Sequence, residues 1–183
     1  MNLERKYIDL LHDAYKRYDR LNEWERYNFS GMNELQEQEL FNENVPITLI
    51  NLLKIINGTS DHTEFFEFDK IPYCLFNSER ILNTDIQFIK NDLVDLYDFD
   101  SKAIDEKIDI NSSNLKWFKI GQDSFNNGGT SSIYIDMTPS IKGTTGQIVI
   151  FVHDPDTYKV IANSLEEFLQ MIIDAGFSFL SYE

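Results

Sequence analysis

The chain has 183 residues, 31 of them acidic and 16 basic, and a formal net charge of −15. This length fits one domain, and the negative charge repels phosphate backbones, which argues against a nucleic-acid-binding protein. Acidity keeps a protein soluble and is also compatible with a basic protein partner. Residues 61–110 hold 13 acids and 5 bases, so over half of the excess negative charge lies in the middle of the chain.

No part of the sequence predicts export or a membrane span. The N-terminal residues Met-Asn-Leu-Glu-Arg-Lys-Tyr lack the apolar run of a signal peptide. The longest apolar runs, such as residues 148–152, are far shorter than the roughly 20 residues that cross a bilayer. The single cysteine, Cys74, cannot form an internal disulfide and fits a reducing compartment. These features predict a soluble, cytoplasmic protein that does not act at a membrane.

The first part of the chain predicts helices. Apolar residues at helical spacing predict an amphipathic helix over residues 3–21 and a short second helix over residues 34–39. Pro46 suits the first turn of an almost wholly apolar helix, which Asn57-Gly58 should end. A helix that is apolar on nearly all sides is expected to be buried on more than one of them.

The middle of the chain is less regular. Residues 63–68 are typical of a strand or hairpin arm, which Pro72 interrupts. Ser78 suits the N-cap of one helix, or of the first of two short helices, extending to about Tyr97. From there to Ser113 the acidic, polar sequence predicts a loop with room for one helical turn.

The last part predicts strands and a closing helix. The expected strands are residues 115–120, 131–137, 147–153 and 158–162. Gly121 should end the first of them, and Asn126-Asn127-Gly128-Gly129 predicts a turn before the second. The continuous apolar run of 147–153 predicts a central strand, joined to the next by a short hairpin turn. Ser164 and Glu167 predict a capping box for the closing helix, which ends at Gly176.

Helices followed by mainly antiparallel strands and one more helix indicate an α+β fold. We expect one domain over residues 1–183, with a mixed, mostly antiparallel sheet of about 4–6 strands. The sheet should be flanked by the N-terminal helices and by the C-terminal helix.

Four segments occur in an order that is typical of a known family. They are the Pro46 helix ending at Asn57-Gly58, then Trp117-Phe118-Lys119-Ile120-Gly121, then Gly128-Gly129 with Ile133-Tyr134-Ile135-Asp136, and finally Gly146-Gln147-Ile148 with Phe151-Val152-His153-Asp154 and the Ser164 helix. The set resembles the SUKH superfamily, in its bacterial branch similar to the yeast cell-wall assembly regulator. It spans about residues 41–176, which leaves residues 1–40 as a helical N-terminal extension.

The resemblance implies a binding protein with a sheet flanked by helices. Bacterial members of the superfamily are commonly immunity proteins that neutralise polymorphic toxins, often nucleases, by direct binding. The first hypothesis is therefore a non-enzymatic immunity protein, either a monomer or a weak homodimer. Against a basic nuclease, an acidic surface would speed encounter and mimic phosphate. The candidate contacts are acids expected to face solvent, namely Asp98, Asp100, Asp123 and Asp136.

Two other functions stay open. Fungal relatives regulate cell-wall synthesis, so the protein could be a regulatory or scaffolding module in cell-envelope assembly. Residues 1–40 would then be a docking arm, and their deletion should abolish binding and leave a folded core. A hydrolase with a carboxylate-based site is the third hypothesis, and it requires a deep pocket lined by two close carboxylates.

The sequence provides little for catalysis or for a cofactor. His153 and Asp154 are neighbours at a strand end and point to opposite faces, so they are poorly placed as joint ligands. Asp98 and Asp100 lack the Gly and the final Glu of a calcium-binding loop. No nucleophile signature, metalloprotease motif or phosphate-binding loop occurs. We expect no enzymatic activity, no cofactor and no metal.

Overall fold

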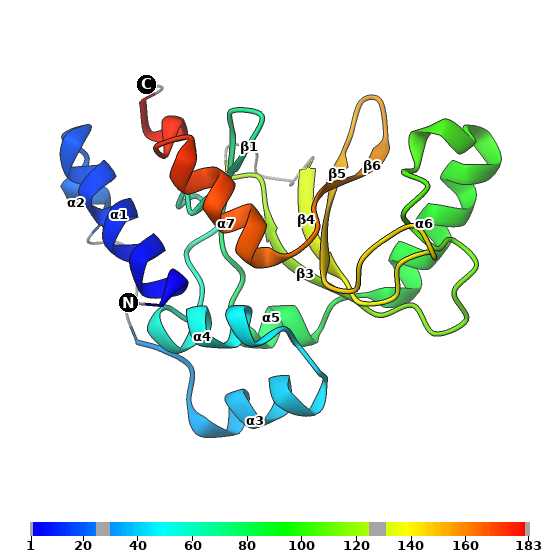
Figure 1. Ribbon diagram of the computed structural model, residues 1–183, viewed down its shortest axis with the longest axis horizontal. Helices are drawn as coiled ribbons and strands as arrows, with labels where there is room; N and C mark the ends of the chain where they lie inside the picture. Colours follow the sequence, from blue (N-terminus) through cyan, green and yellow to red (C-terminus); the bar gives the residue numbers. More distant parts are fainter. Residues whose placement is uncertain (1, 25–29, 125–130, 182–183) are drawn as a thin grey trace.

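The computed structural model describes residues 2–24, 30–124 and 131–181. Within these ranges the chain forms seven α-helices and two antiparallel sheets (Figure 1). The elements are α1 Leu3–Arg17, α2 Leu21–Trp24, α3 Glu34–Asn42, α4 Ile47–Ile55, β1 Phe66–Phe68, β2 Ile71–Tyr73, α5 Ser78–Leu82, α6 Ile86–Phe99, β3 Trp117–Gln122, β4 Ser131–Asp136, β5 Gln147–Val152, β6 Thr157–Ala162 and α7 Leu165–Asp174, with 3₁₀ turns at Ser101–Ala103 and Ser178–Ser181.

The main sheet has four strands in the order β3-β4-β5-β6, and each neighbouring pair is antiparallel. β5 is an interior strand and forms a hairpin with β6, as its continuous apolar sequence predicts. The strands β1 and β2 form a separate hairpin. The predicted α+β fold with an antiparallel sheet is therefore confirmed.

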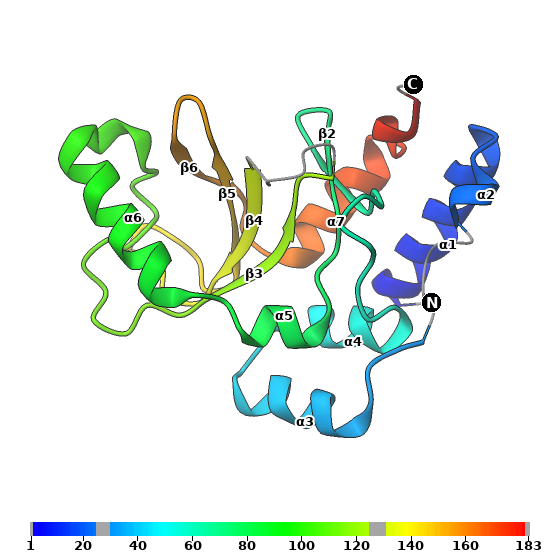
Figure 2. The same ribbon diagram turned by 180° about the vertical axis from the view of Figure 1, so that it is seen from behind.

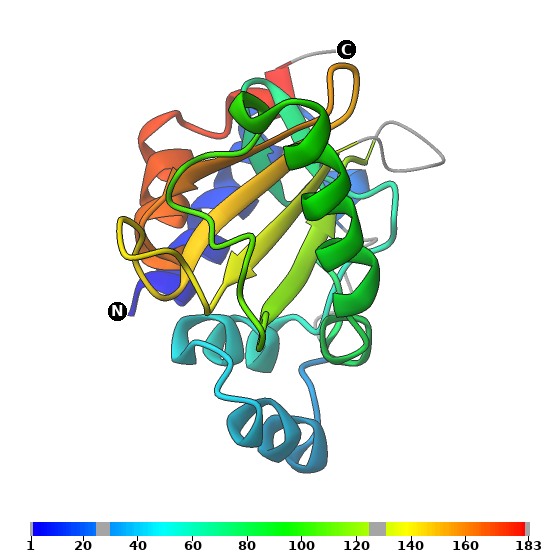
Figure 3. The same ribbon diagram turned by 90° about the vertical axis from the view of Figure 1, so that its right-hand side faces the viewer.

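Helices cover both faces of the main sheet. Because successive strand residues point to opposite faces, Ile133, Ile135 and Ile148 pack into the larger core, together with residues of α1, α4 and α7. Tyr134 and Val149 face the other way, into a smaller core that includes buried residues of α6. Figure 1 shows α1 and α7 on one side of the sheet and α6 on the other, and Figure 3 shows α6 standing in front of the strands.

Helix α1 contributes to the larger core. Tyr7, Leu11 and Tyr15 are fully or almost fully buried, and the Tyr15 hydroxyl donates a 3.1 Å hydrogen bond to the carbonyl oxygen of Glu64. Asn2 caps the start of the helix, since its side chain accepts a hydrogen bond from the Arg5 N–H. These contacts join the N-terminal helix to the rest of the chain at several points.

One edge of the main sheet is covered by the segment that follows β2. The N–H of Cys74 donates to the carbonyl of Gln122 at 2.9 Å, and the N–H of Phe76 donates to the carbonyl of Ile120 at 2.8 Å. Figure 2, which shows the molecule from behind, places β2 close to the end of β3, with α3, α4 and α5 below. Residues of the β1–β2 region thereby join the larger core beside α7.

Three local predictions are corrected by the structure. Asn77, rather than Ser78, is the N-cap of α5, because the Asn77 side chain accepts the N–H of Arg80 at 2.9 Å. Gly121 lies inside β3, where the register with β4 shifts, and does not end the strand. Ser164 does cap α7, but the Glu167 carboxylate accepts the N–H of Asn163 instead of the N–H of the N-cap residue.

Two further predictions differ in their bounds: the helix expected over residues 3–21 is the two helices α1 and α2, and α4 ends at Ile55, before Asn57-Gly58. The predicted helix over residues 78–97 is two helices, α5 and α6, which was one of the two forms expected. The predicted turn at Asn126-Asn127-Gly128-Gly129 lies outside the described ranges. Within those ranges, the helices are too short or too polar to span a bilayer.

Candidate functional site

Helix α6 is held on the sheet by its inner face. The Asp85 side chain caps its first turn by accepting the Phe88 N–H at 2.9 Å. Ile89 and Leu93 are buried against aromatic residues of the sheet. On the flank of the helix, the Asp92 carboxylate accepts a 2.6 Å hydrogen bond from the Tyr158 hydroxyl. The sheet thus fixes both the position and the rotation of α6.

The outer face of α6, defined here as Phe88, Asp95, Asp98 and Phe99, points to solvent. At 100° per residue, Asp95 and Asp98 lie roughly opposite Ile89 and Leu93, and Phe88 and Phe99 lie about 100–120° away from them, on the flank of the helix. Phe99 is 90% exposed and Phe88 is 63% exposed. Val94 and Tyr97 of the same helix are also more than one-third exposed. Of these residues, Phe88 and Phe99 lie three turns apart on the same side of the helix, and exposed apolar surface of this kind is typical of an interaction site.

The acids of this outer face are not paired. Within the described part of the chain, no basic side chain forms an ion pair with Asp95 or Asp98. Between residues 86 and 103 the sequence has four acids and two bases. The last turn of α6 contains no base, although the C-terminal end of a helix is its negative end. The face therefore combines exposed aromatic surface with uncompensated negative charge.

A hollow of about 300 Å³ lies beside the end of this helix, between α6 and the β5–β6 turn. Its apolar walls come from Leu96, Phe99 and Ala103. Its acidic rim comes from Asp100, Asp154 and Asp156. One rim acid, Asp156, also hydrogen-bonds to the Nδ1 of His153. Figure 1 shows the β5–β6 turn and the upper end of α6 at the same end of the molecule.

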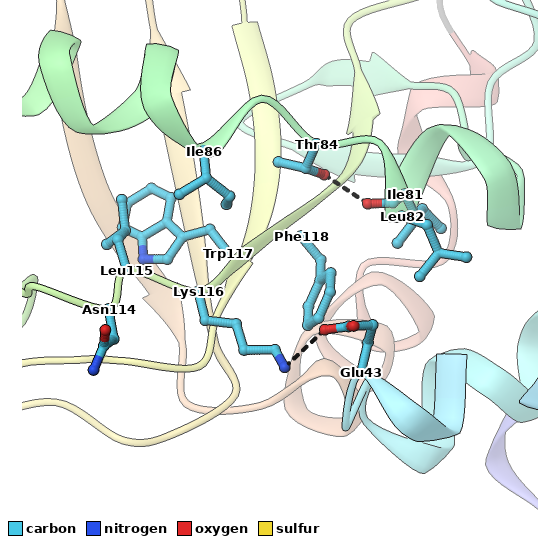
Figure 4. A pocket seen from close by; sticks show the side chains of 10 residues that line it. All are labelled: Glu43, Ile81, Leu82, Thr84, Ile86, Asn114, Leu115, Lys116, Trp117 and Phe118. Atoms are coloured by element: carbon cyan, nitrogen blue, oxygen red, sulfur yellow. Dashed lines mark hydrogen bonds and ion pairs between the residues drawn. The ribbon is translucent and has the colours of Figure 1, made fainter. Parts of the chain in front are cut away.

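A second cleft, of about 330 Å³, lies along the edge strand β3 (Figure 4). Its walls are mostly apolar, from Ile81, Leu82, Ile86, Leu115, Trp117 and Phe118. Its charged lining residues are Glu43 and Lys116, which form an ion pair of 3.1 Å. The Thr84 hydroxyl accepts the N–H of Lys119 at 2.9 Å and donates to the carbonyl of Ile81 at 2.7 Å. Glu43, Lys116 and Thr84 therefore each have a partner, and the two charges neutralise one another.

A comparison with known protein families shows which family the chain belongs to. A model of the SMI1 / KNR4 family (SUKH-1) matches residues 33–171, well over half of the chain. The chain belongs to this family. The match confirms the resemblance seen in the sequence and extends over nearly the same residues. No curated protein matches the chain.

The SUKH-1 region contains every element described above as a candidate site. Helix α6, the hollow at its end and the β3 cleft all lie within residues 33–171, whereas α1 and α2 precede them. A function common to the family should therefore use the strands, α3 to α6, most of α7 or their loops. The exposed outer face of α6 meets this condition.

The four acids predicted from the sequence fall into two groups. Asp98 and Asp100 are exposed, at and just after the end of α6, and lie close to Phe99. Asp123 is 3% exposed and Asp136 is fully buried. The expectation that Asp123 and Asp136 face solvent is therefore wrong. The structure brings Asp98 and Asp100 together at one surface and separates them from the other two.

Asp123 and Asp136 lie at strand ends, since Asp136 ends β4 and Asp123 directly follows β3. Asp136 ends β4, where its Oδ1 accepts the N–H of Thr138 at 2.8 Å and its Oδ2 accepts the Nε2–H of Gln147 at 2.9 Å. Burial raises the pKa of Asp136, although these hydrogen bonds oppose the rise. Asp123 forms a β-bridge with Tyr73 at the junction of the two sheets.

The described residues do not form a metal site. No group of three or more His, Cys, Asp or Glu side chains within the described ranges is arranged to hold a metal ion. Among the three histidines, His153 is exposed and hydrogen-bonds to Asp156, in the strand-end position expected of it. Such a pair at an open surface lacks the enclosed environment that tunes a catalytic acid or base.

Sequence reasoning missed Phe88 and Phe99 as site residues. The helical region was predicted from Ile81, Leu82, Ile86, Ile89, Leu93, Leu96 and Tyr97, and of these Ile86, Ile89, Leu93 and Leu96 pack on the sheet. Phe88 and Phe99 are eleven residues apart, three full turns, and therefore share a different face. The spacing of Phe88 and Phe99 can be read from the sequence, and it shows that both residues lie off the buried stripe of the helix.

Proposed function

We propose that the protein is a non-enzymatic binding protein, and that it acts as a cytoplasmic immunity protein which neutralises a polymorphic toxin by direct binding. Membership in the SUKH-1 family is compatible with this role. The observation that carries the proposal is the outer face of α6, where Phe99 is 90% exposed next to unpaired acids. Exposed aromatic side chains are the residues that most often dominate the energy of protein–protein interfaces.

A binding role explains these features better than a hydrolase does. The β3 cleft has one carboxylate among its lining residues, Glu43, and Lys116 neutralises it. The acids of the hollow beside α6 lie at an open surface, whereas carboxylate catalysis requires a site that excludes water. A surface that attracts and holds a partner needs neither a deep pocket nor a tuned acid.

The scaffolding hypothesis with residues 1–40 as a docking arm has less support. Tyr7, Leu11 and Tyr15 of α1 are buried in the larger core. The side of α1 that could bind a partner is therefore its charged outer side, because the main apolar stripe of the helix is buried. We retain the immunity role as the proposed function.

The test is neutralisation of a defined toxin. Each protein encoded next to this gene is expressed from an inducible promoter, with and without the full 183-residue chain, to find a toxin. We expect cells to survive only with the chain, and the purified proteins to elute together as a stoichiometric complex in size-exclusion chromatography. Failure of the chain to protect cells or to bind any neighbouring toxin would refute the immunity role.

A further inference from the structure

We propose that the end of α6 and the β5–β6 turn form the contact site for the partner, and that the partner inserts a lysine or arginine side chain, flanked by apolar surface, into the hollow between them. The inference rests on the proposed function, because it names the partner chemistry for that same surface. It follows from three features of the site: its charge, its apolar walls and its shape.

The charge of the site favours a cation. The C-terminal end of a helix carries a partial negative charge, so a base in the last turn is stabilising and an acid there is unfavourable. Helix α1 has Lys16 and Arg17 in its last turn, whereas α3 and α7, like α6, have no base there. Helix α6 has no base in its last turn and instead has Asp98 there, with Asp100 directly after it. A cation from the partner would compensate this charge.

The walls of the hollow suit the stem of a long basic side chain. Leu96, Phe99 and Ala103 provide apolar surface on one side. Lysine and arginine bury their methylene groups against such surface and keep the charged end near polar groups. The exposed ring of Phe99 also provides a face on which a cation can lie.

The rim of the hollow places carboxylates where the charged end would arrive. Asp100, Asp154 and Asp156 line the hollow together with the apolar walls. Asp100 uses its Oδ1 to accept the N–H of Lys102 at 3.0 Å, which leaves its Oδ2 available. No ion pair within the described ranges involves Asp100 or Asp154. A volume of about 300 Å³ is small for a peptide segment and suits a single long side chain.

The experiment measures binding of the full chain to an inactivated form of the toxin domain that the neutralisation test identifies. The two test variants are Phe99→Ser and the double variant Asp98→Asn with Asp154→Asn. The matched controls are Leu35→Ser, an exposed apolar residue of α3, and Glu34→Gln with Glu39→Gln, two exposed acids of the same helix. Thermal unfolding confirms that each variant is folded. Because all these side chains are exposed, we expect the midpoints to shift only slightly, through the charges of Asp98 and Glu34 at the helix ends.

The two test variants should weaken binding to the toxin in different ways. Phe99→Ser should raise the dissociation constant roughly 30-fold or more, because it truncates a central aromatic contact. The double Asp variant should slow association about 10-fold at low salt and make the association rate less dependent on salt. Both controls should bind like the wild-type chain. A lysine or arginine of the toxin that couples to Asp154 in a double-mutant cycle would identify the inserted side chain.

The outcomes separate the two proposals. If the wild-type chain binds the toxin and both test variants bind equally well, the contact site is wrong and the proposed function stands. If the α3 controls weaken binding and the α6 variants do not, the interface lies on α3 and this inference is overturned. If the wild-type chain binds no neighbouring toxin, the proposed function fails and the inference fails with it.

Discussion

The Tyr158 hydroxyl donates a 2.6 Å hydrogen bond to the Asp92 carboxylate and so joins β6 to the middle of α6, across 66 residues of sequence. Burial raises the pKa of Tyr158 well above its usual value, so the hydroxyl remains a donor at neutral pH. Among the acids of α6, Asp92 is thus used to fix the helix on the sheet. Asp95 and Asp98 lie on the outer face and have no such structural role.

Replacing Tyr158 with Phe should destabilise the protein. The variant keeps the buried ring and removes the hydroxyl, which leaves the partly buried Asp92 carboxylate without this donor. We expect the free energy of unfolding to fall by about 1–2 kcal/mol, measured by urea denaturation. The control is Tyr97→Phe on the exposed side of the same helix, which should change it by less than about 0.5 kcal/mol. Equal effects of the two variants would show that the hydrogen bond does not stabilise the fold.

Replacing Gly121 with Ala should also destabilise the protein, for a steric reason. A Cβ at position 121 would lie 2.2 Å from the carbonyl oxygen of Cys74, and that backbone segment is hydrogen-bonded to β3. We expect a loss of about 2 kcal/mol or more in the free energy of unfolding. In Gly176→Ala a Cβ would meet no atom within 4 Å, and the cost comes only from its φ of +68°. That variant should lose about 1 kcal/mol, so a larger loss at Gly176 than at Gly121 would contradict this explanation.

Local signals in the sequence predicted most elements of the fold. Three of these elements depend only on residues that are close in sequence, namely the apolar run in β5, the short β5–β6 turn and the cap at Ser164. Each occurs where expected. Gly121 was misread because its role depends on a distant segment. The carbonyl of Cys74 approaches Gly121 at the edge of the sheet, and the residues next to Gly121 in sequence do not predict that contact.

The positions of the four acids show the same limit. Alternation along β4 predicts which residues share a face, but it cannot predict that α6 covers the second face. Asp136 shares that face and is buried with Thr138 and Gln147 as its hydrogen-bond partners, whereas Asp98, which follows the last buried turn of a helix, is exposed as expected. A long-range packing contact decides the first case and helical periodicity decides the second. Whether Asp98 and Asp100 contact a partner stays a prediction.

The N-terminal helix should be essential for stability. Leu11 is fully buried in the larger core, so Leu11→Ala should cost about 3 kcal/mol in the free energy of unfolding. Deletion of residues 1–40 would expose much of that core, so we expect an unfolded or aggregated product in place of a folded one. The control, Asp13→Ala on the exposed side of α1, should change stability by less than about 0.5 kcal/mol. A truncated chain that unfolds cooperatively with near wild-type stability would contradict this prediction.

The buried Asp136 carboxyl should make stability depend on pH in a defined direction. Burial raises its pKa, so the folded chain binds this proton more tightly than the unfolded chain does. Its contribution to stability is complete below the usual pKa of aspartate and is lost as the pH rises through the raised pKa of the folded state.

Asp136→Asn removes this titration, and the comparison with wild type isolates it. The free energy of unfolding of wild type minus that of the variant, measured by urea denaturation, should be largest in acid and should decrease as the pH rises toward neutrality. Ser131→Ala on the same strand is the control, because it changes a hydrogen-bonded hydroxyl that does not titrate in this range. Its difference from wild type should stay constant with pH. A difference for Asp136→Asn that increases with pH would mean that the hydrogen bonds from Thr138 and Gln147 outweigh the burial of the carboxylate.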